Sequence, residues 1–461
     1  MPSSTSITIF GAGSIVFSLA LVKDVCLTKS LSGSRITFMD INQERLDMIH
    51  SLATRYAEDL GADLQFAKTT DRQAALRDAA FVVSAATVND EYYNRKAREL
   101  ADKYGYFYGR TGMHRYWNPV LMLDVARDME RLCPNAWLLQ AGNPVFDGTT
   151  YVTRESSIKM VGLCHGHYGY RGVASTIGLD VDKVTFQAPG LNHNIWMTHF
   201  LYEGQDAYPL LDQWIEEKAA AFWAEKEKTD AGIPMQMSPA AIHQYKMYGL
   251  MPIGDTVRRG GWWYHDGMPA RLRWYGGPFG AKDTPEGRDR VIAGKEAKYA
   301  QMTKAAFDPK VRPVDLFGAE KTREQHVPII DALVNDHEGQ FQVNVPNKGA
   351  LPGLPDDVAV EVPAVVNIMG IQPLRVSPLP RKVLLEHVYP EWLRMEVELE
   401  ALKTRDRSMV LWSILDSHET RSYDQALEVL DALFALEQTD GTPAMKLMTP
   451  LSEYYRSAKE L

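Results

Sequence analysis

Cysteine, long apolar runs and clustered basic residues are all scarce in this sequence. Three of the 461 residues are cysteine, and so small and odd a number excludes a disulfide framework and suits a reducing compartment. No apolar stretch reaches the roughly 18 residues that a membrane span needs, and no basic segment of the signal-peptide kind opens the chain. We therefore expect a cytoplasmic protein without a membrane partner.

Positive charge is also in deficit. The formal net charge is -9, and no long stripe of Lys and Arg occurs. Because nucleic-acid binding needs clustered cations to neutralise phosphates, this composition favours a small-molecule partner and not a nucleic acid. The hydrophobic share of 45% is ordinary for a globular protein, and 461 residues exceed the usual size of one domain. We expect two closely packed domains.

Strand and helix signals alternate over the first third of the chain. Short apolar runs predict strands at residues 7–10, 35–39, 81–84, 136–140 and 159–163. Helical periodicity predicts helices from Ser14 to about Thr28, after Asn42 as far as Gly61, and over roughly 121–132. This alternation predicts an α/β fold with a Rossmann-type, doubly wound parallel sheet, of the lactate/malate dehydrogenase-like kind. Residues 1–170 would form this NAD-binding domain, and residues 171–461 an α+β domain for substrate, metal and oligomerisation.

A short glycine loop lies between the first strand and the first helix. Gly11 allows a tight turn, Gly13 lets the backbone approach a pyrophosphate, and Ser14 opens the expected helix. Val16 stands where the dinucleotide fingerprint has its third glycine. Asp40, at the end of the second strand, would accept hydrogen bonds from an adenosine ribose and repel a 2′-phosphate, which favours NAD over NADP. The alternative is a structural turn beside a helix-entry carboxylate.

Cys164 and His193 lie on two loops 29 residues apart and could together hold a divalent metal. Two protein ligands leave open positions for a substrate, whereas structural sites usually close with four. Cys164 and Asn143 both follow expected strands, so both would face the crevice where ligands bind. The alternatives are a buried, inert cysteine and a core histidine.

Several motifs point in one direction when they are taken together. They are Gly-Ala-Gly-Ser at 11–14, Asn-Pro at 143–144, Cys-His-Gly-His-Tyr-Gly at 164–169, Gly-Leu-Asn-His at 190–193, Met-Pro-Ile-Gly-Asp-Thr-Val-Arg at 251–258, Glu-Gln-His at 324–326 and Pro-Asn-Lys-Gly at 346–349. This combination resembles glycoside hydrolase family 4, the NAD- and manganese-dependent glycosidases, over nearly the whole chain. The Cys-His-Gly-His variant is similar to the α-glucosidase branch.

The resemblance implies a retaining glycosidase that hydrolyses α-glucosides without net oxidation. NAD would take hydride from C3 of the sugar, which makes the C2 proton acidic; deprotonation, elimination, water addition and return of the hydride follow. Cys164 and His193 would hold a metal that the sugar oxygens O2 and O3 chelate. A sulfur and nitrogen pair suits Mn²⁺, and also Co²⁺, Ni²⁺ or Fe²⁺.

The resemblance also assigns proton-transfer roles. Asp255 is the candidate base at C2, with contact to the metal or a turn carboxylate as alternatives. Arg258 would orient metal-bound water or sugar oxygens. His165 is the candidate general acid because histidine is a common proton donor near neutral pH, and His114 is the alternative donor.

Asn143 would place the sugar against the nicotinamide, and Asn192 could help to position it. An α-galactoside or α-uronide is the alternative substrate, and phosphorylated sugars stay open. A hydroxy-acid dehydrogenase is the alternative from another class, because it shares the nucleotide-domain architecture. The resemblance further implies a homodimer or homotetramer built through the second domain.

Overall fold

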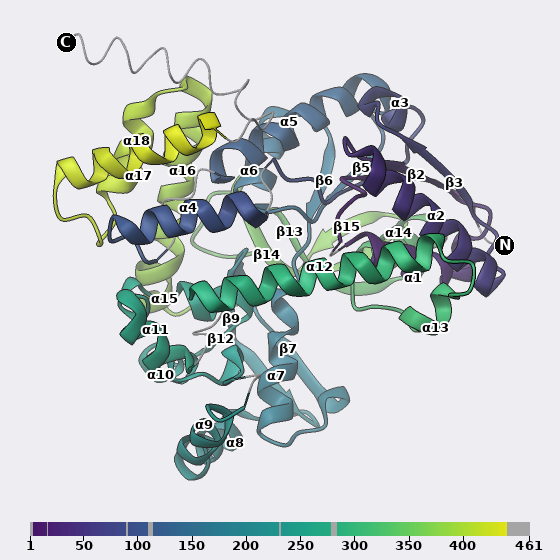
Figure 1. The fold of residues 1–461 in the computed structure, drawn as a ribbon. Helices are drawn as coiled ribbons and strands as arrows, with labels where there is room; N and C mark the ends of the chain where they lie inside the picture. Colours follow the sequence, from purple (N-terminus) through teal and green to yellow (C-terminus); the bar gives the residue numbers. More distant parts are fainter. Residues whose placement is uncertain are drawn as a thin grey trace, which may run out of the picture.

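The computed structural model describes residues 3–15, 17–88, 91–108, 114–229, 232–277 and 284–439. Within these residues a 12-stranded sheet forms the centre of the molecule, in the order β12-β9-β8-β14-β13-β6-β5-β4-β1-β2-β3, with β15 paired to β14 (Figure 1). Its strands are β1 Ser6–Phe10, β2 Arg35–Met39, β3 Gln65–Thr69, β4 Phe81–Ser84, β5 Trp137–Gln140, β6 Lys159–Gly162, β8 Gly190–Leu191, β9 Asn194–Met197, β12 Met251–Ile253, β13 Gly339–Pro346, β14 Ala359–Asn367 and β15 Gly370–Pro373.

One half of this sheet is parallel. Strands β1 to β6 pair in the order 3-2-1-4-5-6, which is that of a dinucleotide-binding domain. The inner strands β1, β4, β5 and β6 are short and mostly buried, as expected where helices cover both faces. The predicted Rossmann-type sheet is therefore confirmed, and β3 is a strand that the sequence pattern did not reveal.

The helices follow the sequence signals closely in places. They are α1 Ser18–Cys26, α2 Gln43–Leu60, α3 Arg72–Leu76, α4 Glu91–Lys103, α5 His114–Leu132, α6 Val145–Glu155, α7 Gly169–Thr176, α8 Tyr208–Glu217, α9 Ala219–Lys226, α10 Pro239–Tyr248, α11 Gly267–Tyr275, α12 Pro285–Phe307, α13 Pro313–Phe317, α14 His326–Asn335, α15 Arg381–Val383, α16 Tyr389–Thr404, α17 Arg407–Leu415 and α18 Tyr423–Thr439. Asn42 caps α2 through a 3.0 Å bond from the Arg45 amide, and Gly61 ends it in the left-handed region.

The predicted start of the first helix is wrong. It begins at Ser18, because the Ser14 amide donates to the Gly11 carbonyl at 3.0 Å and closes a turn first. The glycine loop is therefore longer than the sequence pattern suggested. Val16, which takes the place of the third glycine, lies outside the described residues.

The other half of the sheet is antiparallel and continues directly from β6. Asn344 of β13 pairs with Gly162 of β6 and with Glu361 of β14, and Glu361 pairs with Gly190 of β8. These four residues form one row across the sheet. Cys164 lies two residues after Gly162, and Asn192 lies two residues after Gly190. Where the two domains divide stays a prediction, because a single sheet runs through both.

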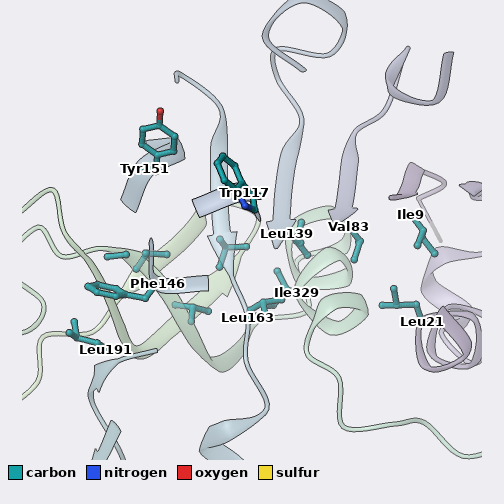
Figure 2. Packing of buried hydrophobic residues seen from close by; sticks show 14 of the residues in the cluster. Ile9, Leu21, Val83, Trp117, Leu139, Phe146, Tyr151, Leu163, Leu191 and Ile329 are labelled. Atoms are coloured by element: carbon teal, nitrogen blue, oxygen red, sulfur yellow. The ribbon is translucent and has the colours of Figure 1, made fainter. Parts of the chain in front are cut away.

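A large hydrophobic core holds the two ends of that row. Leu163 and Leu191, beside Cys164 and Asn192, are 4% and 0% exposed and belong to the cluster that includes Leu139 and Phe146. Figure 2 shows these side chains among those of the cluster. Burial of each leucine stabilises its strand end by roughly 1.5–3 kcal/mol. The loops that follow are thus anchored to the core.

A smaller lobe extends from the sheet at the bottom of Figure 1. It contains α7 to α9 and the three-stranded sheet of β7 Val184–Gln187, β10 His199–Tyr202 and β11 Gln205–Asp206, with its own buried cluster. Helices α16 to α18 gather near α4 at another side of the molecule. None of the helices within the described residues has both the length and the apolar character that crossing a membrane requires.

Candidate active site

The glycine loop closes on the end of β2. Gly11 has φ +73°, and a Cβ there would lie 2.7 Å from the Ala86 backbone. A Cβ on Gly13 would lie 2.8 Å from the Asp40 carboxylate, which accepts a 2.7 Å hydrogen bond from the Gly13 amide. Both glycines are therefore needed for close approach of backbone to neighbouring groups. Ser14 is partly buried and belongs to the same turn.

Asp40 ties this loop to the start of α2. Its Oδ2 accepts from Gly13 and its Oδ1 accepts from the Asn42 amide at 2.8 Å. Each carboxylate oxygen can accept more than one hydrogen bond, so Asp40 keeps capacity for a ribose hydroxyl. The carboxylate thus serves as the helix-entry residue, the alternative that the sequence left open, and remains available to a nucleotide.

Cys164 lies where β6 has ended, on a loop held by its own backbone. Its sulfur accepts from the Gly166 amide at 3.4 Å, and its carbonyl accepts from Nδ1 of the buried His167 at 3.0 Å. Burial raises the pKa of the Cys164 thiol to about 12, the Glu361 carboxyl adds to the rise, and a hydrogen bond with Asn192 opposes it. The Asn192 side chain therefore connects the cysteine loop to the loop that carries His193.

The Asn192 side chain is held in turn by the buried carboxyl of Glu361. Its amide donates to Oε2 of Glu361 at 3.0 Å, and Glu361 is 1% exposed in the middle of β14. Burial raises the pKa of Glu361 to about 7, although its hydrogen bonds with neighbouring amides lower it. This buried carboxyl stands behind both candidate loops.

His193, Asp255 and Arg258 lie close to one another. His193 has φ +62°, an uncommon conformation for a residue with a side chain. Its Nε2 lies 3.6 Å from Oδ2 of Asp255, and Nη1 of Arg258 lies 3.7 Å from Oδ1 of the same carboxylate. Asp255 also raises the pKa of the Cys164 thiol, so it acts on both candidate metal ligands.

His165 faces Glu324, which comes from the segment before α14. The distance from His165 Nε2 to Glu324 Oε1 is 3.6 Å, and Glu324 Oε2 lies 3.4 Å from Nδ1 of the buried His326. Burial raises the pKa of Glu324, but the hydrogen bond with His326 and the charges of His165 and His167 outweigh it, so the net pKa lies below its ordinary value. An ionised Glu324 can orient the His165 imidazole.

Asn143 and His114 are the two remaining candidate residues outside the glycine loop. Asn143 is exposed after β5, and its carbonyl accepts from the Asn118 amide at 2.6 Å. Since its backbone is fixed in this way, the Asn143 side chain is available to a ligand. His114, the alternative proton donor, begins α5, but its side chain lies outside the described part of the chain.

The donor set around Cys164 fits a divalent cation. Asp255 and Glu361 both oppose ionisation of the thiol, and a bound cation would reverse that effect by favouring the thiolate. In the portions of the chain that are described, no three or more His, Cys, Asp or Glu side chains are grouped to hold a metal. A cation held by Cys164 and His193 would keep coordination positions open for a substrate or water.

Sequence reasoning missed two carboxylates of this site. Glu361 is a lone charge in the otherwise apolar run Ala359–Asn367, and such a charge in a buried strand is a usable signal. Glu324 lay within a recognised motif, but its proximity to His165 depends on the tertiary fold. Both come from segments more than 150 residues beyond Cys164.

Known proteins share these features along the chain. The model named Family 4 glycosyl hydrolase matches residues 6–178, and the model named Family 4 glycosyl hydrolase C-terminal domain matches residues 188–419. The chain belongs to glycosyl hydrolase family 4. The resemblance drawn from the motifs is thereby confirmed, and this family 4 member is a glycosidase.

The curated relatives of this family 4 chain differ in their named substrates. A probable 6-phospho-β-glucosidase of Bacillus subtilis is 29% identical over 74% of this chain and 75% of the relative. An α-galactosidase of the same organism is 26% identical over 93% of this chain and 97% of the relative. An α-glucosidase of Erwinia rhapontici is 24% identical over 94% of this chain and 98% of the relative. The names therefore leave the sugar undecided.

Solved structures share the fold of this family 4 chain. A 6-phospho-α-glucosidase from gut microorganisms, in complex with NAD and Mn²⁺, has a TM-score of 0.78 at 18% identity and covers 95% of this chain and 99% of its own. A lactate dehydrogenase from Eimeria maxima, with NADH and oxamate, has a TM-score of 0.52 at 12% identity over 88% and 96%. The predicted kinship with the dehydrogenase fold is confirmed.

Proposed function

We propose that this protein is an NAD- and divalent-metal-dependent retaining glycosidase that acts on unphosphorylated α-glucosides. The observation that carries the proposal is the position of Asp255, whose carboxylate lies 3.6 Å from Nε2 of His193 and raises the pKa of the Cys164 thiol. The solved relative that contains NAD and Mn²⁺ supports the same cofactors here, with Co²⁺, Ni²⁺ or Fe²⁺ as substitutes. When bound, they would supply a hydride acceptor and electrostatic stabilisation of negative charge.

The side chains of the protein would transfer the protons and bind the sugar and NAD. Asp255, which faces His193 and Arg258, would take the proton from C2 of the sugar. His165, oriented by Glu324, would donate a proton to the departing oxygen. Asn143 would bind sugar hydroxyls, while Gly11, Gly13, Ser14 and Asp40 would hold NAD.

The basic residues near the site support an unphosphorylated sugar. Recognition of a phosphate needs Arg, Lys or amide groups that converge on it. Arg258 faces Asp255, Arg259 is 2.8 Å from Glu391, and Arg271 is 3.1 Å from Asp102. Each of these arginines therefore has a carboxylate partner in a different direction.

The test is hydrolysis of p-nitrophenyl α-glucoside with NAD, Mn²⁺ and a thiol reductant, in parallel with the α-galactoside, α-glucuronide and glucoside 6-phosphate. We expect the free α-glucoside to be cleaved, with loss of activity when NAD is omitted or the metal is chelated. Substrate deuterated at C2 should react more slowly. Asp255→Asn should abolish turnover, whereas Asp266→Asn, at an exposed aspartate nearby, should not.

Three results would contradict the proposal. Hydrolysis that ignores both NAD and metal would exclude the mechanism. Preference for another glycoside in the panel would retain the mechanism and replace the substrate. Net formation of NADH from a 2-hydroxy acid would favour the dehydrogenase alternative.

A further inference from the structure

A cavity of about 340 Å³ lies between β7, the start of β13 and the segment that precedes α14. Its lining is mainly aromatic and carboxamide side chains, among them Tyr168, Phe186, Phe341, Gln187, Gln340 and Gln342. Gln340 and Arg323 are exposed and place its mouth at the surface. The volume is within the range of roughly 300–1,000 Å³ that is usual for small-molecule sites.

This cavity adjoins the candidate active site through two of its walls. His167 lines it and donates to the carbonyl of Cys164 at 3.0 Å. Glu324 also lines it and is the carboxylate that faces His165 at 3.6 Å. The cavity therefore begins where the candidate general acid is held.

The chemistry of the lining suits an uncharged, hydroxylated ring. Partly exposed aromatic rings can pack on the apolar face of a sugar, and the exposed Gln340 carboxamide can both donate to and accept from its hydroxyls. Of the described lining residues, Arg323 is the one Lys or Arg, which is too few for a phosphate clamp.

We propose that this cavity binds the leaving-group sugar of an α-linked disaccharide. The inference rests on the proposed function, because a general acid must stand beside the departing oxygen. The His165 ring has Glu324 on one side and the Tyr168 ring at 5.1 Å, and both of these residues line the cavity. A sugar that departs past His165 thus leaves through this space.

Gln340→Trp tests the proposal by filling the mouth of the cavity from an exposed position. The matched control is Gln65→Trp, another exposed glutamine on β3 at the far end of the sheet. The measurement is the ratio of kcat/KM for maltose to kcat/KM for methyl α-glucoside, whose leaving group is methanol. We expect Gln340→Trp to lower this ratio by about tenfold or more, the effect of losing contacts in one subsite, and Gln65→Trp to leave it unchanged. Thermal unfolding of both variants checks that they fold.

A binding measurement separates this proposal from the proposed function. Saturation-transfer NMR of maltose with the full chain, NAD and EDTA reports contact at the reducing-end ring without hydrolysis. We expect contact in the wild type and in Gln65→Trp, and its loss in Gln340→Trp. Contact without cleavage of any α-glucoside would overturn the proposed function alone. An unchanged kcat/KM ratio, or reducing-end contact that is absent from the wild type or survives in Gln340→Trp, would overturn the cavity proposal.

Discussion

The parallel and antiparallel halves of the central sheet support the active site in different ways. In the parallel half, Gly11, Gly13 and Asp40 lie within 30 residues of one another; the Gly13 amide donates to Asp40 and the Gly11 amide donates to the carbonyl of Met39 beside it. Where the antiparallel half joins it, Cys164 follows β6, Asn192 follows β8 and Glu361 lies on β14, which are strands far apart in sequence that the sheet brings together through β13. The nucleotide loop is thus a local structure, whereas the metal site depends on strand register.

The two halves therefore depend on different kinds of residue. A local loop loses function when one of its own residues changes. A site built on register also depends on buried residues that touch no ligand, of which Glu361 is the clearest case. Substitutions in the two halves should therefore separate binding of NAD from binding of metal.

The largest expected effect is that of removing a candidate metal ligand. Cys164→Ser should lower kcat/KM by about 10²–10³-fold or more, as for loss of a preorganised electrostatic group, because a hydroxyl is a poorer ligand than a thiolate. Mn²⁺ binding, followed by calorimetry, should weaken in parallel, while NAD binding stays. Cys133→Ser, at a buried cysteine away from the site, is the control and should retain metal binding. Equal metal affinity of Cys164→Ser and the wild type would show that Cys164 is not a metal ligand.

Core leucines give the second comparison. Leu139→Ala in β5 and Leu191→Ala in β8 both empty fully buried positions of one cluster, and each should lower the free energy of unfolding by about 2–5 kcal/mol. Leu191 precedes Asn192, so Leu191→Ala should also weaken metal binding, whereas Leu139→Ala should not. Urea unfolding and metal titration measure the two effects. Similar metal affinities of the two variants would show that register alone, and not core packing, fixes the Asn192 loop.

Much of the parallel half could be predicted from the sequence, because its signals are local. The bounds of α2 follow from Asn42 and Gly61, and the alternation of apolar runs with helical periodicity fixes the sheet type. The start of α1 was misplaced because a turn at Ser14 competes with the helix.

The antiparallel half was less predictable for a physical reason. Motif resemblance pointed to Cys164, His193 and Asp255, but it could not reveal that β13 and β14 insert between β6 and β8. Their register places Glu361 behind Asn192, and no local pattern around either residue encodes that contact. Pairings between distant strands are settled by the whole fold.

Glu361→Gln should have an intermediate effect. It preserves the shape of the side chain and removes the negative charge behind the metal site, so Mn²⁺ affinity should fall by about 10–100-fold, as for other outer-shell substitutions. Glu338→Gln, at an exposed glutamate, is the control. Unchanged Mn²⁺ affinity in Glu361→Gln would limit this carboxyl to a packing role.

The same substitution makes a prediction about pH. Burial raises the pKa of Glu361 to about 7 in the folded protein, above its ordinary value of 4.5. The folded state therefore keeps a proton that the unfolded state loses, and the free energy of unfolding falls as the pH rises from about 4.5 to about 7. In EDTA, Glu361→Gln should lack this contribution, which denaturant titrations at several pH values can measure. A decline of the same slope in both proteins would assign the pH dependence to other groups.

The smallest expected effect falls in the parallel half, at Asp40. Asp40→Asn keeps an acceptor for the Gly13 amide and loses the charge, so NAD affinity should fall by about tenfold, the difference between a charged and a neutral hydrogen bond. NADP affinity should fall less or rise, since repulsion of its 2′-phosphate disappears. Asp47→Asn, at an aspartate on α2 that pairs with Lys68 and not with the loop, is the control. Fluorescence titration with NADH and NADPH distinguishes the two roles of Asp40. Equal loss for both cofactors would mean that Asp40 acts only by holding the glycine loop, and a selective loss for NADH would mean that its charge contacts the ribose.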